Sequence, residues 1–133
     1  MNPPPALGIF FGAGIGALLR WGLAAALNPL VPMLPLGTLA ANTLGGLLMG
    51  MSLALFNQFG ALSPALRLTL TTGFLGGLTT FSTFSAETVT LLMRGQVGWA
   101  SGLVASHVGL SLLATWLGYA AVHGLLVTSG GTA

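Results

Sequence analysis

The chain has 133 residues, of which 54% are hydrophobic and 3% are charged, and its mean hydropathy is +0.95. Soluble domains carry about 25% charged residues, so this composition predicts an integral membrane protein and leaves no room for a soluble domain beside the spans. A net charge of +2 is too small for a nucleic-acid-binding surface, and the lack of Cys excludes disulfides and thiolate metal sites.

Apolar segments in chain order predict four membrane-spanning helices, over residues 6–27, 36–57, 65–93 and 98–127. About 20 residues cross a bilayer core, so each segment is long enough to span it. The first helix should end at Asn28-Pro29, and Ser63-Pro64 is typical of a helix N-cap followed by Pro at the first helical position. We therefore expect an all-α membrane protein, with a single four-helix transmembrane domain over residues 1–133.

The third span contains a run that is unlike a membrane helix, GFLGGLTTFSTFSAE over residues 73–87. Glycines and clustered hydroxyl residues are weak helix formers, so the run predicts a break near residues 76–80. An unbroken helix over this span would be about 43 Å long against a bilayer core of about 30 Å, which agrees with a break. Irregular backbone at membrane depth must be buried in protein or line a watery cavity, so we expect a polar or ion-binding site here.

Glycines recur four residues apart on three predicted helices, at Gly8, Gly12 and Gly16, at Gly46 and Gly50, and at Gly98 and Gly102. Such faces let helix backbones pack closely in lipid, and packing is the role we expect for them. Four short helices hardly enclose a pore by themselves, so a homo-oligomer is the expected assembly.

The distribution of arginines gives almost no topology signal. An even number of spans places both chain ends and the second loop on one side, which has Arg67 near a helix end. The opposite side has Arg94, and Arg20 lies toward it within the first span. This bias is too small to fix the orientation, so the sequence permits insertion both ways up.

Three side chains near the break are candidates for ion binding. Asn42 offers two amide donors without a charge; such an amide is usually a helix–helix hydrogen bond, but the nearby break favours a ligand role. Phe81 and Phe84 share one helix face. An aromatic ring has a positive edge and a negative face, so ring edges suit a small anion and ring faces suit a cation, and the spacing does not decide between them.

Charged and polar residues elsewhere leave several alternatives open. Glu87, the only carboxylate, is a functional candidate by default within a membrane, or else a residue near a mouth held by hydroxyls or water. Arg20 either snorkels to the interface or sets a positive potential at a vestibule. On the fourth helix, three polar residues follow one another at intervals of four positions, His107, Ser111 and Thr115. We expect them either to form a second polar wall or to make hydrogen bonds between helices. No base neighbours a nucleophile, so no enzyme is predicted.

Three runs, GAGIGALLRW (12–21), GTLAANTLGG (37–46) and GFLGGLTTFSTFSAE (73–87), resemble the Fluc (CrcB) family of fluoride channels, and the likeness covers all four spans in layout. The resemblance implies a homodimer of antiparallel, dual-topology subunits in the plasma membrane, the inner membrane of a bacterium. Two pores along the subunit interface would export fluoride passively and protect the cell from its toxicity. The expected partners are a second copy of the chain, membrane lipid and fluoride, with no nucleic acid.

The resemblance also implies roles for individual residues. The fluoride pore would be lined by the paired phenylalanines, the pore amide, two hydroxyls and the acid, which are Asn42, Phe81, Ser82, Thr83, Phe84 and Glu87. A buried structural Na⁺ at the dimer interface would be held by the backbone carbonyls of Gly76 and Thr79. Arg20 would lie at the vestibule. Neutral donors and ring edges suit an anion that must bind and also leave.

Two rival functions remain open from the sequence. Proton-coupled small multidrug transporters are also small four-helix dual-topology dimers built around one membrane Glu, a role that Glu87 could take. In that class the Glu should lie on the first helix, whereas Glu87 follows the broken third helix. A structural or assembly subunit is the third possibility, and it would need no central hydroxyl track.

Overall fold

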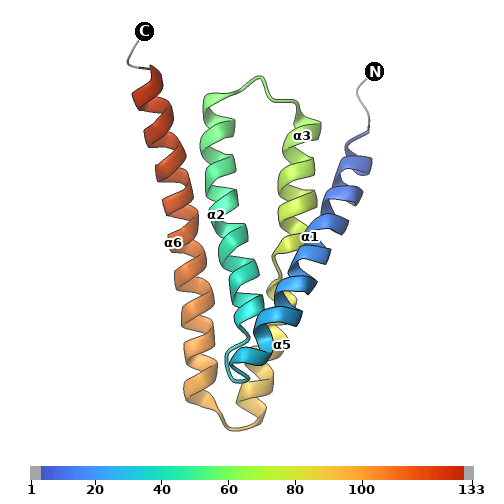
Figure 1. Cartoon of the computed structure of the whole chain (residues 1–133), viewed down its shortest axis with the longest axis vertical. Helices are drawn as coiled ribbons and strands as arrows, with labels where there is room; N and C mark the ends of the chain where they lie inside the picture. The colour runs from blue at the N-terminus through green and yellow to red at the C-terminus, as the bar shows by residue number, and fades with distance from the viewer. Residues whose placement is uncertain (1–3, 131–133) are drawn as a thin grey trace.

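The structure, a computed structural model, describes residues 4–130, and this part of the chain contains helices and no strand (Figure 1). The elements in order are α1 (Pro5–Leu27), η1 (Asn28–Leu30), α2 (Leu36–Gln58), α3 (Pro64–Leu68), η2 (Thr69–Leu75), α4 (Gly76–Leu78), α5 (Phe81–Met93) and α6 (Val97–Gly130). The expected all-α class is confirmed, and α1, α2 and α6 begin and end close to the predicted bounds.

Three helical segments are long and apolar enough to cross a membrane, Pro5–Leu30, Leu36–Gln58 and Val97–Gly130. Between α2 and α6 the chain runs back through α3, η2, α4 and α5, which we call the broken segment (Figure 1). The start of α1, the α2–α3 connection and the end of α6 lie at the same end of the molecule (Figure 1). The chain is therefore a multi-pass membrane protein.

The side chain of Asn28, which lies outside α2, satisfies two of the first backbone N–H donors of α2. The residue before α2, Pro35, makes no side-chain capping bond. Instead Asn28 Oδ1 accepts hydrogen bonds from the backbone N–H groups of Gly37 at 2.8 Å and Thr38 at 3.2 Å. The first N–H groups of a helix have no partner within it, so Asn28 caps α2 from the end of α1. The N-cap predicted at Ser63 is confirmed, because its hydroxyl accepts from Leu66 N–H at 3.2 Å.

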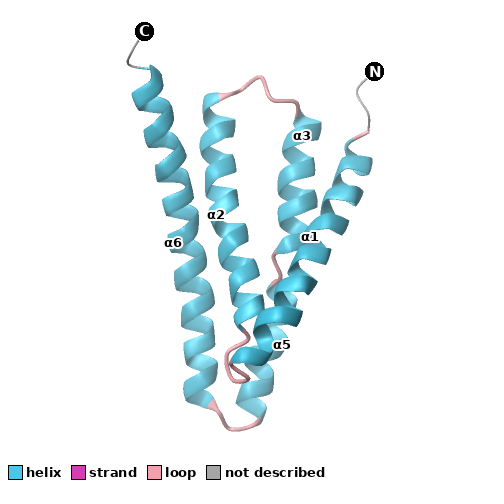
Figure 2. Ribbon diagram, in the orientation of Figure 1, coloured by secondary structure: helices cyan, strands magenta, loops and turns pink. Residues whose placement is uncertain are grey.

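The predicted break in the broken segment is confirmed, and it lies at two threonines. Thr79 has ψ 155° and Thr80 has φ −150° and ψ 116°, so both are extended between α4 and α5. Figure 2 shows this interruption as a pink stretch below α3. Gly76 is helical, with φ −62° and ψ −37°, so the expectation that the glycines unwind the helix is wrong. The turn before it, η2, is a π-helix, which the sequence did not predict.

The glycines instead allow α1 to lie directly on the broken segment. A Cβ atom at Gly16 would collide with Phe74 O and Leu78 N, and one at Gly77 would collide with the backbone of Ala13. The same close approach joins α2 to α6, where a Cβ at Gly50 would collide with Thr115 O. The predicted packing role is therefore confirmed for Gly16 and Gly50, and Gly77 is a packing glycine that the sequence did not predict. Gly98 and Gly102 have open space around them within the chain.

Replacing Gly16 with Ala should destabilise the protein, because the clashing atoms belong to the backbone of the broken segment and cannot rotate away. We expect a loss of about 1–3 kcal/mol, the usual cost of overpacking. Gly14 on the same helix has nothing within 4 Å of a Cβ, so Gly14→Ala should be neutral or gain up to about 1 kcal/mol from helix propensity. Thermal unfolding of the purified variants in detergent measures both, and equal stability would contradict the packing assignment.

Two buried clusters lie on either side of the break. Ala41, Leu75 and Leu78 join α2 to the first half of the broken segment. Phe84 and Leu91 of the second half pack on Ala100 and Leu103 of α6. Each half of the broken segment is therefore held by its own apolar contacts, with the extended residues between them.

Candidate functional site

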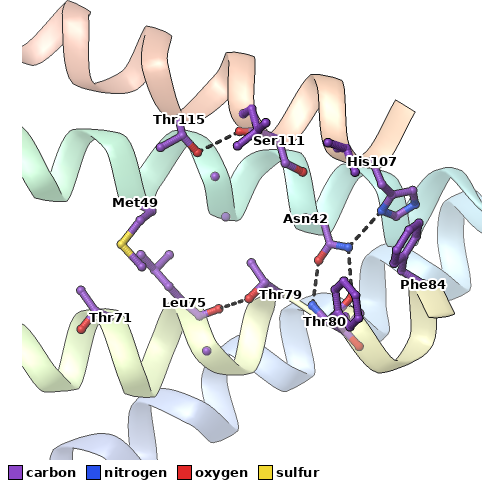
Figure 3. A pocket seen from close by; sticks show the side chains of 16 residues that line it. Asn42, Met49, Thr71, Leu75, Thr79, Thr80, Phe84, His107, Ser111 and Thr115 are labelled. Carbon is purple, nitrogen blue, oxygen red and sulfur yellow. Dashed lines mark hydrogen bonds between the residues drawn. The ribbon is translucent and has the colours of Figure 1, made fainter. Parts of the chain in front are cut away.

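Asn42 in the first third of α2 binds the backbone of the break. Its Oδ1 accepts from Thr80 N–H at 2.7 Å, and its Nδ2 donates to Thr80 C=O at 3.0 Å (Figure 3). Since the Thr80 N–H can only donate, the amide oxygen must face it, and this fixes the orientation of the amide. The side chain of Asn42 thus satisfies both backbone polar groups of Thr80.

The second amide hydrogen of Asn42 connects the break to α6. Asn42 Nδ2 lies 3.1 Å from His107 Nδ1. The amide nitrogen cannot accept, so Nδ1 accepts and the proton of the neutral ring sits on Nε2. His107 is 4% exposed, and its Nε2 is one of the buried side-chain atoms without a partner among the described residues. Both donors of Asn42 are therefore used within the chain, and a buried donor of His107 is left over.

Two backbone carbonyls at the break lose the partners that a continuous helix would give them. Thr80 N–H, which would donate to Gly76 O, is bound to Asn42, and Thr83 N–H, which would donate to Thr79 O, is bound to Thr80 Oγ1 at 3.1 Å. The carbonyl between them, Gly77 O, accepts from Arg20 Nε at 2.9 Å. The two residues expected to hold a cation, Gly76 and Thr79, therefore have carbonyls released by the break.

The two phenylalanines lie at the start of α5 with very different exposure. Their ring centroids are 5.5 Å apart at an interplanar angle of 60°. Phe84 is 9% exposed and tilts against His107 with a centroid distance of 4.7 Å, whereas Phe81 is 80% exposed. The shared face expected from the spacing is confirmed, and Phe81 has little contact with its own chain.

The hydroxyls expected in the pore lie around the N-terminus of α5. Thr80 is the N-cap of this helix, and its Oγ1 donates to Thr83 Oγ1 at 3.0 Å and lies 3.3 Å from Ser82 Oγ. These three residues form a connected hydroxyl cluster. Its first effect is structural, since it satisfies an N–H group that the break exposes.

Glu87 lies one helical turn beyond Phe84 and contacts the start of α2. Thr38 Oγ1 donates to Glu87 Oε1 at 2.7 Å, and Thr38 is 2% exposed. The other carboxylate oxygen, Oε2, is buried without a partner among residues 4–130. The acid is thus held by a hydroxyl, as one of the two sequence interpretations expected, and Thr38 is a contact that sequence reasoning did not assign to it.

A cleft of about 490 Å³ lies between α2, the broken segment and α6. Its lining brings together Asn42, Gly76, Thr79, Phe81 and Phe84 from the predicted site, and His107, Ser111 and Thr115 from α6 (Figure 3). Ser82, Thr83, Glu87 and Arg20 are not among the lining residues. Thr115 Oγ1 donates to Ser111 O on its own helix at 2.8 Å. All three α6 residues therefore line the cleft, and the expected interhelical hydrogen bond is present at His107, which contacts Asn42.

The cleft has the chemistry of a site for a weakly held ion. Its lining combines aliphatic side chains, among them Leu75, Val108 and Leu112, with amide, imidazole, hydroxyl and aromatic groups, and it contains no side chain with a full charge. Within residues 4–130 no group of three or more His, Cys, Asp or Glu could hold a metal ion. The released carbonyls of the break offer oxygen ligands to a cation, and the aromatic ring edges offer positive poles to an anion.

Comparisons with known proteins agree with these features. Residues 7–119 match the family model of the CrcB-like protein, Camphor Resistance (CrcB). A fluoride-specific ion channel FluC of Aromatoleum aromaticum is 58% identical over 120 residues, which cover 90% of this chain and 92% of that protein. A fluoride-specific ion channel FluC of Pseudomonas paraeruginosa is 54% identical over 120 residues, covering 90% of this chain and 94% of the relative. The chain belongs to the CrcB family.

Proposed function

We propose that the protein is a fluoride-selective ion channel that exports fluoride passively and protects the cell from fluoride toxicity. The observation that carries this proposal is the cleft at the break, which combines aromatic rings and neutral polar groups with aliphatic side chains and has no charged side chain. A permeating anion must bind well enough to enter and weakly enough to leave, and neutral groups satisfy both conditions. The relatives that share more than half of their aligned residues carry the name of fluoride-specific ion channels.

The proposed fluoride path runs along the helix that follows the break. Ring edges of Phe81 and Phe84 replace part of the water around the ion, because these edges carry the positive part of the aromatic quadrupole. The amide of Asn42 stands beside Phe84 in the same cleft, which supports this assignment. We place the hydroxyls of Ser82 and Thr83 beside the rings at the start of α5, and Glu87 one turn further along. Arg20 adds positive potential at the vestibule.

We propose that the broken segment is the fourth membrane crossing and that two antiparallel chains form the channel, with two pores along their interface. Two observations support a partner on the cleft. The cleft is open on one side of the chain. Phe81, the first residue of α5, lines this cleft and is 80% exposed. The arginines give almost no topology bias, which suits insertion in both orientations.

Dual topology predicts that the same position is accessible from both sides of the membrane. A single Cys introduced at Val31, in the connection between η1 and α2, should react with a membrane-impermeant maleimide added to either side. The native chain has no Cys, so the label reports this position alone. Labelling from one side only, in protein that still conducts fluoride, would contradict the antiparallel dimer.

A structural Na⁺ at the dimer interface is the cofactor that we propose. The carbonyls of Gly76 and Thr79 fit such an ion, because their helical donors, the N–H groups of Thr80 and Thr83, bond elsewhere. Gly76 is also exposed. Unwound carbonyls of broken membrane helices are known ligands of Na⁺. When bound, the ion would supply positive charge that balances carbonyl dipoles left unpaired by the break. We place the protein in the inner membrane of a bacterium, as a homodimer surrounded by lipid.

Ion flux from proteoliposomes tests the proposed function. Purified protein is reconstituted into vesicles loaded with potassium fluoride or potassium chloride, and release is recorded with ion electrodes after valinomycin is added. We expect fluoride to leave rapidly and chloride to stay. Uptake of a quaternary ammonium ion driven by a pH gradient, without fluoride release, would instead indicate the transporter built on Glu87, which the relatives' names do not favour. Absence of both fluxes would indicate an assembly subunit.

A further inference from the structure

Arg20 makes a contact that a residue serving only as a vestibule charge would not need. It lies one helical turn after Gly16, where α1 touches the backbone of the broken segment. Its Nε donates to Gly77 O at 2.9 Å, although the two residues are 57 positions apart. The guanidinium is half-buried at this point. The close α1 packing therefore brings this side chain to the last turn of α4.

The carbonyl that Arg20 occupies is one of those released by the break. In a continuous helix Gly77 O would accept from Phe81 N–H, but Phe81 begins a new helix after two extended residues. A buried carbonyl without a partner is costly, so a bond from a charged donor at 2.9 Å has a clear effect on stability. Gly76 O and Thr79 O on either side receive no bond from this guanidinium.

We propose that Arg20 is a positioning residue that sets which carbonyls of the break are free. By taking Gly77 O, it holds α4 in place and removes this carbonyl from those released by the break, while Gly76 O and Thr79 O remain available to a cation. This inference rests on the proposed function, because the cation is the Na⁺ proposed there. The role belongs to the Nε–H donor and not to the charge of the side chain.

Without this donor, Gly77 O would join Gly76 O and Thr79 O as a released carbonyl, and these carbonyls would compete for water and for the cation. The free Gly77 carbonyl would then draw the last turn of α4 away from its present geometry. Na⁺ coordination by unwound backbone depends on how those carbonyls are directed. Loss of the Arg20 bond should therefore appear first as loss of Na⁺ binding.

Two neutral substitutions separate the donor from the charge. Gln places its Nε2 the same number of bonds from Cα as Arg places Nε, so Arg20→Gln keeps an N–H donor in reach of Gly77 O. Met has a methyl group at the equivalent position, so Arg20→Met removes the donor with similar length. Both variants lose the same charge. Arg20→Lys is the converse variant, since it keeps the charge and places its nitrogen one bond further along.

The measurement is the shift in melting temperature of detergent-solubilised dimer when Na⁺ replaces N-methylglucamine, together with hydrogen exchange of the backbone amides of residues 76–81. We expect the parent and Arg20→Gln to show a Na⁺-dependent rise and slow exchange. Arg20→Met should lose the Na⁺ dependence and exchange faster. If Arg20→Met does not fold, the inference is tested by Arg20→Gln alone, which must keep the Na⁺-dependent rise in melting temperature.

Three results would overturn the inference. Equal Na⁺ dependence in the Gln and Met variants would show that the bond to Gly77 O does not matter. Loss in Arg20→Gln with retention in Arg20→Lys would assign the effect to charge. If the parent protein conducts fluoride but shows no Na⁺-dependent shift in melting temperature, the proposed cation does not bind at this site and the proposed channel stands. If the parent protein shows no fluoride flux, the channel proposal itself is wrong.

Discussion

Asn42→Asp should abolish fluoride flux, because this nearly isosteric change reverses the polarity of one atom at the centre of the break. The new carboxylate oxygen would face Thr80 O at 3.0 Å and His107 Nδ1 at 3.1 Å, both of which now accept from the amide. Thr80 O loses its donor, at a cost of about 1–3 kcal/mol, and His107 can keep a bond to the new side chain only by moving its proton to Nδ1. An ionised carboxylate would also repel the anion. We expect flux at the background level of empty vesicles and a lower melting temperature.

The neighbouring residue provides the control for this prediction. Thr43 Oγ1 is buried without a partner among the described residues, so Thr43→Val removes a polar atom that makes no bond. That variant should conduct fluoride at the parent rate and be as stable as the parent or more so. A conducting Asn42→Asp variant would show that the amide is neither a pore ligand nor the clamp on Thr80.

Phe81→Ile should reduce fluoride flux sharply while leaving the folded chain unaffected. The side chain is 80% exposed, so its removal deprives the chain of little packing beyond the edge contact with Phe84, about 0.5–1.5 kcal/mol. Ile keeps the site apolar but has no aromatic quadrupole. Flux measured from proteoliposomes should fall, and size-exclusion chromatography should still show the parent assembly.

A second aromatic pair in the chain is the matched control. Phe10 and Phe11 on α1 also meet edge to face, with centroids 5.4 Å apart, and both are exposed. Phe10→Ile should leave flux unchanged. Phe84→Ile is less clean than Phe81→Ile, because Phe84 also packs in the cluster with Leu91 and Leu103. Parent-level conduction in both the Phe81 and Phe84 variants would mean that ring edges do not select the ion.

The helical layout could be predicted from the sequence because it depends on local properties. Apolar length determines the long helices, Ser63 marks the start of α3, and the cluster of glycines and hydroxyl residues signals an interruption in the third span. The position of the interruption could not be predicted, since it depends on distant contacts. Thr80 is extended because Asn42 binds its backbone from 38 residues away.

The candidate site was predicted as a set of residue types but not as a network. Residue patterns identified Asn42, Phe84 and His107 separately, yet nothing in their spacing indicates that the amide of Asn42 bonds the ring of His107. The bond between Thr38 and Glu87 was missed for the same reason, although the helical spacing of Thr38 and Asn42 places both on one face of α2. A single sequence carries no signal for such pairs.

The double bond between Asn42 and Thr80 has a consequence for how the chain can move. The N–H and C=O of Thr80 belong to two successive peptide planes, and one rigid amide holds both. A flip of either plane would break its hydrogen bond to Asn42 and bring like poles together, so rotation is opposed at both planes. We therefore expect the angle between α4 and α5 to stay fixed. The two helices and α2 should then keep their relative positions when an ion passes.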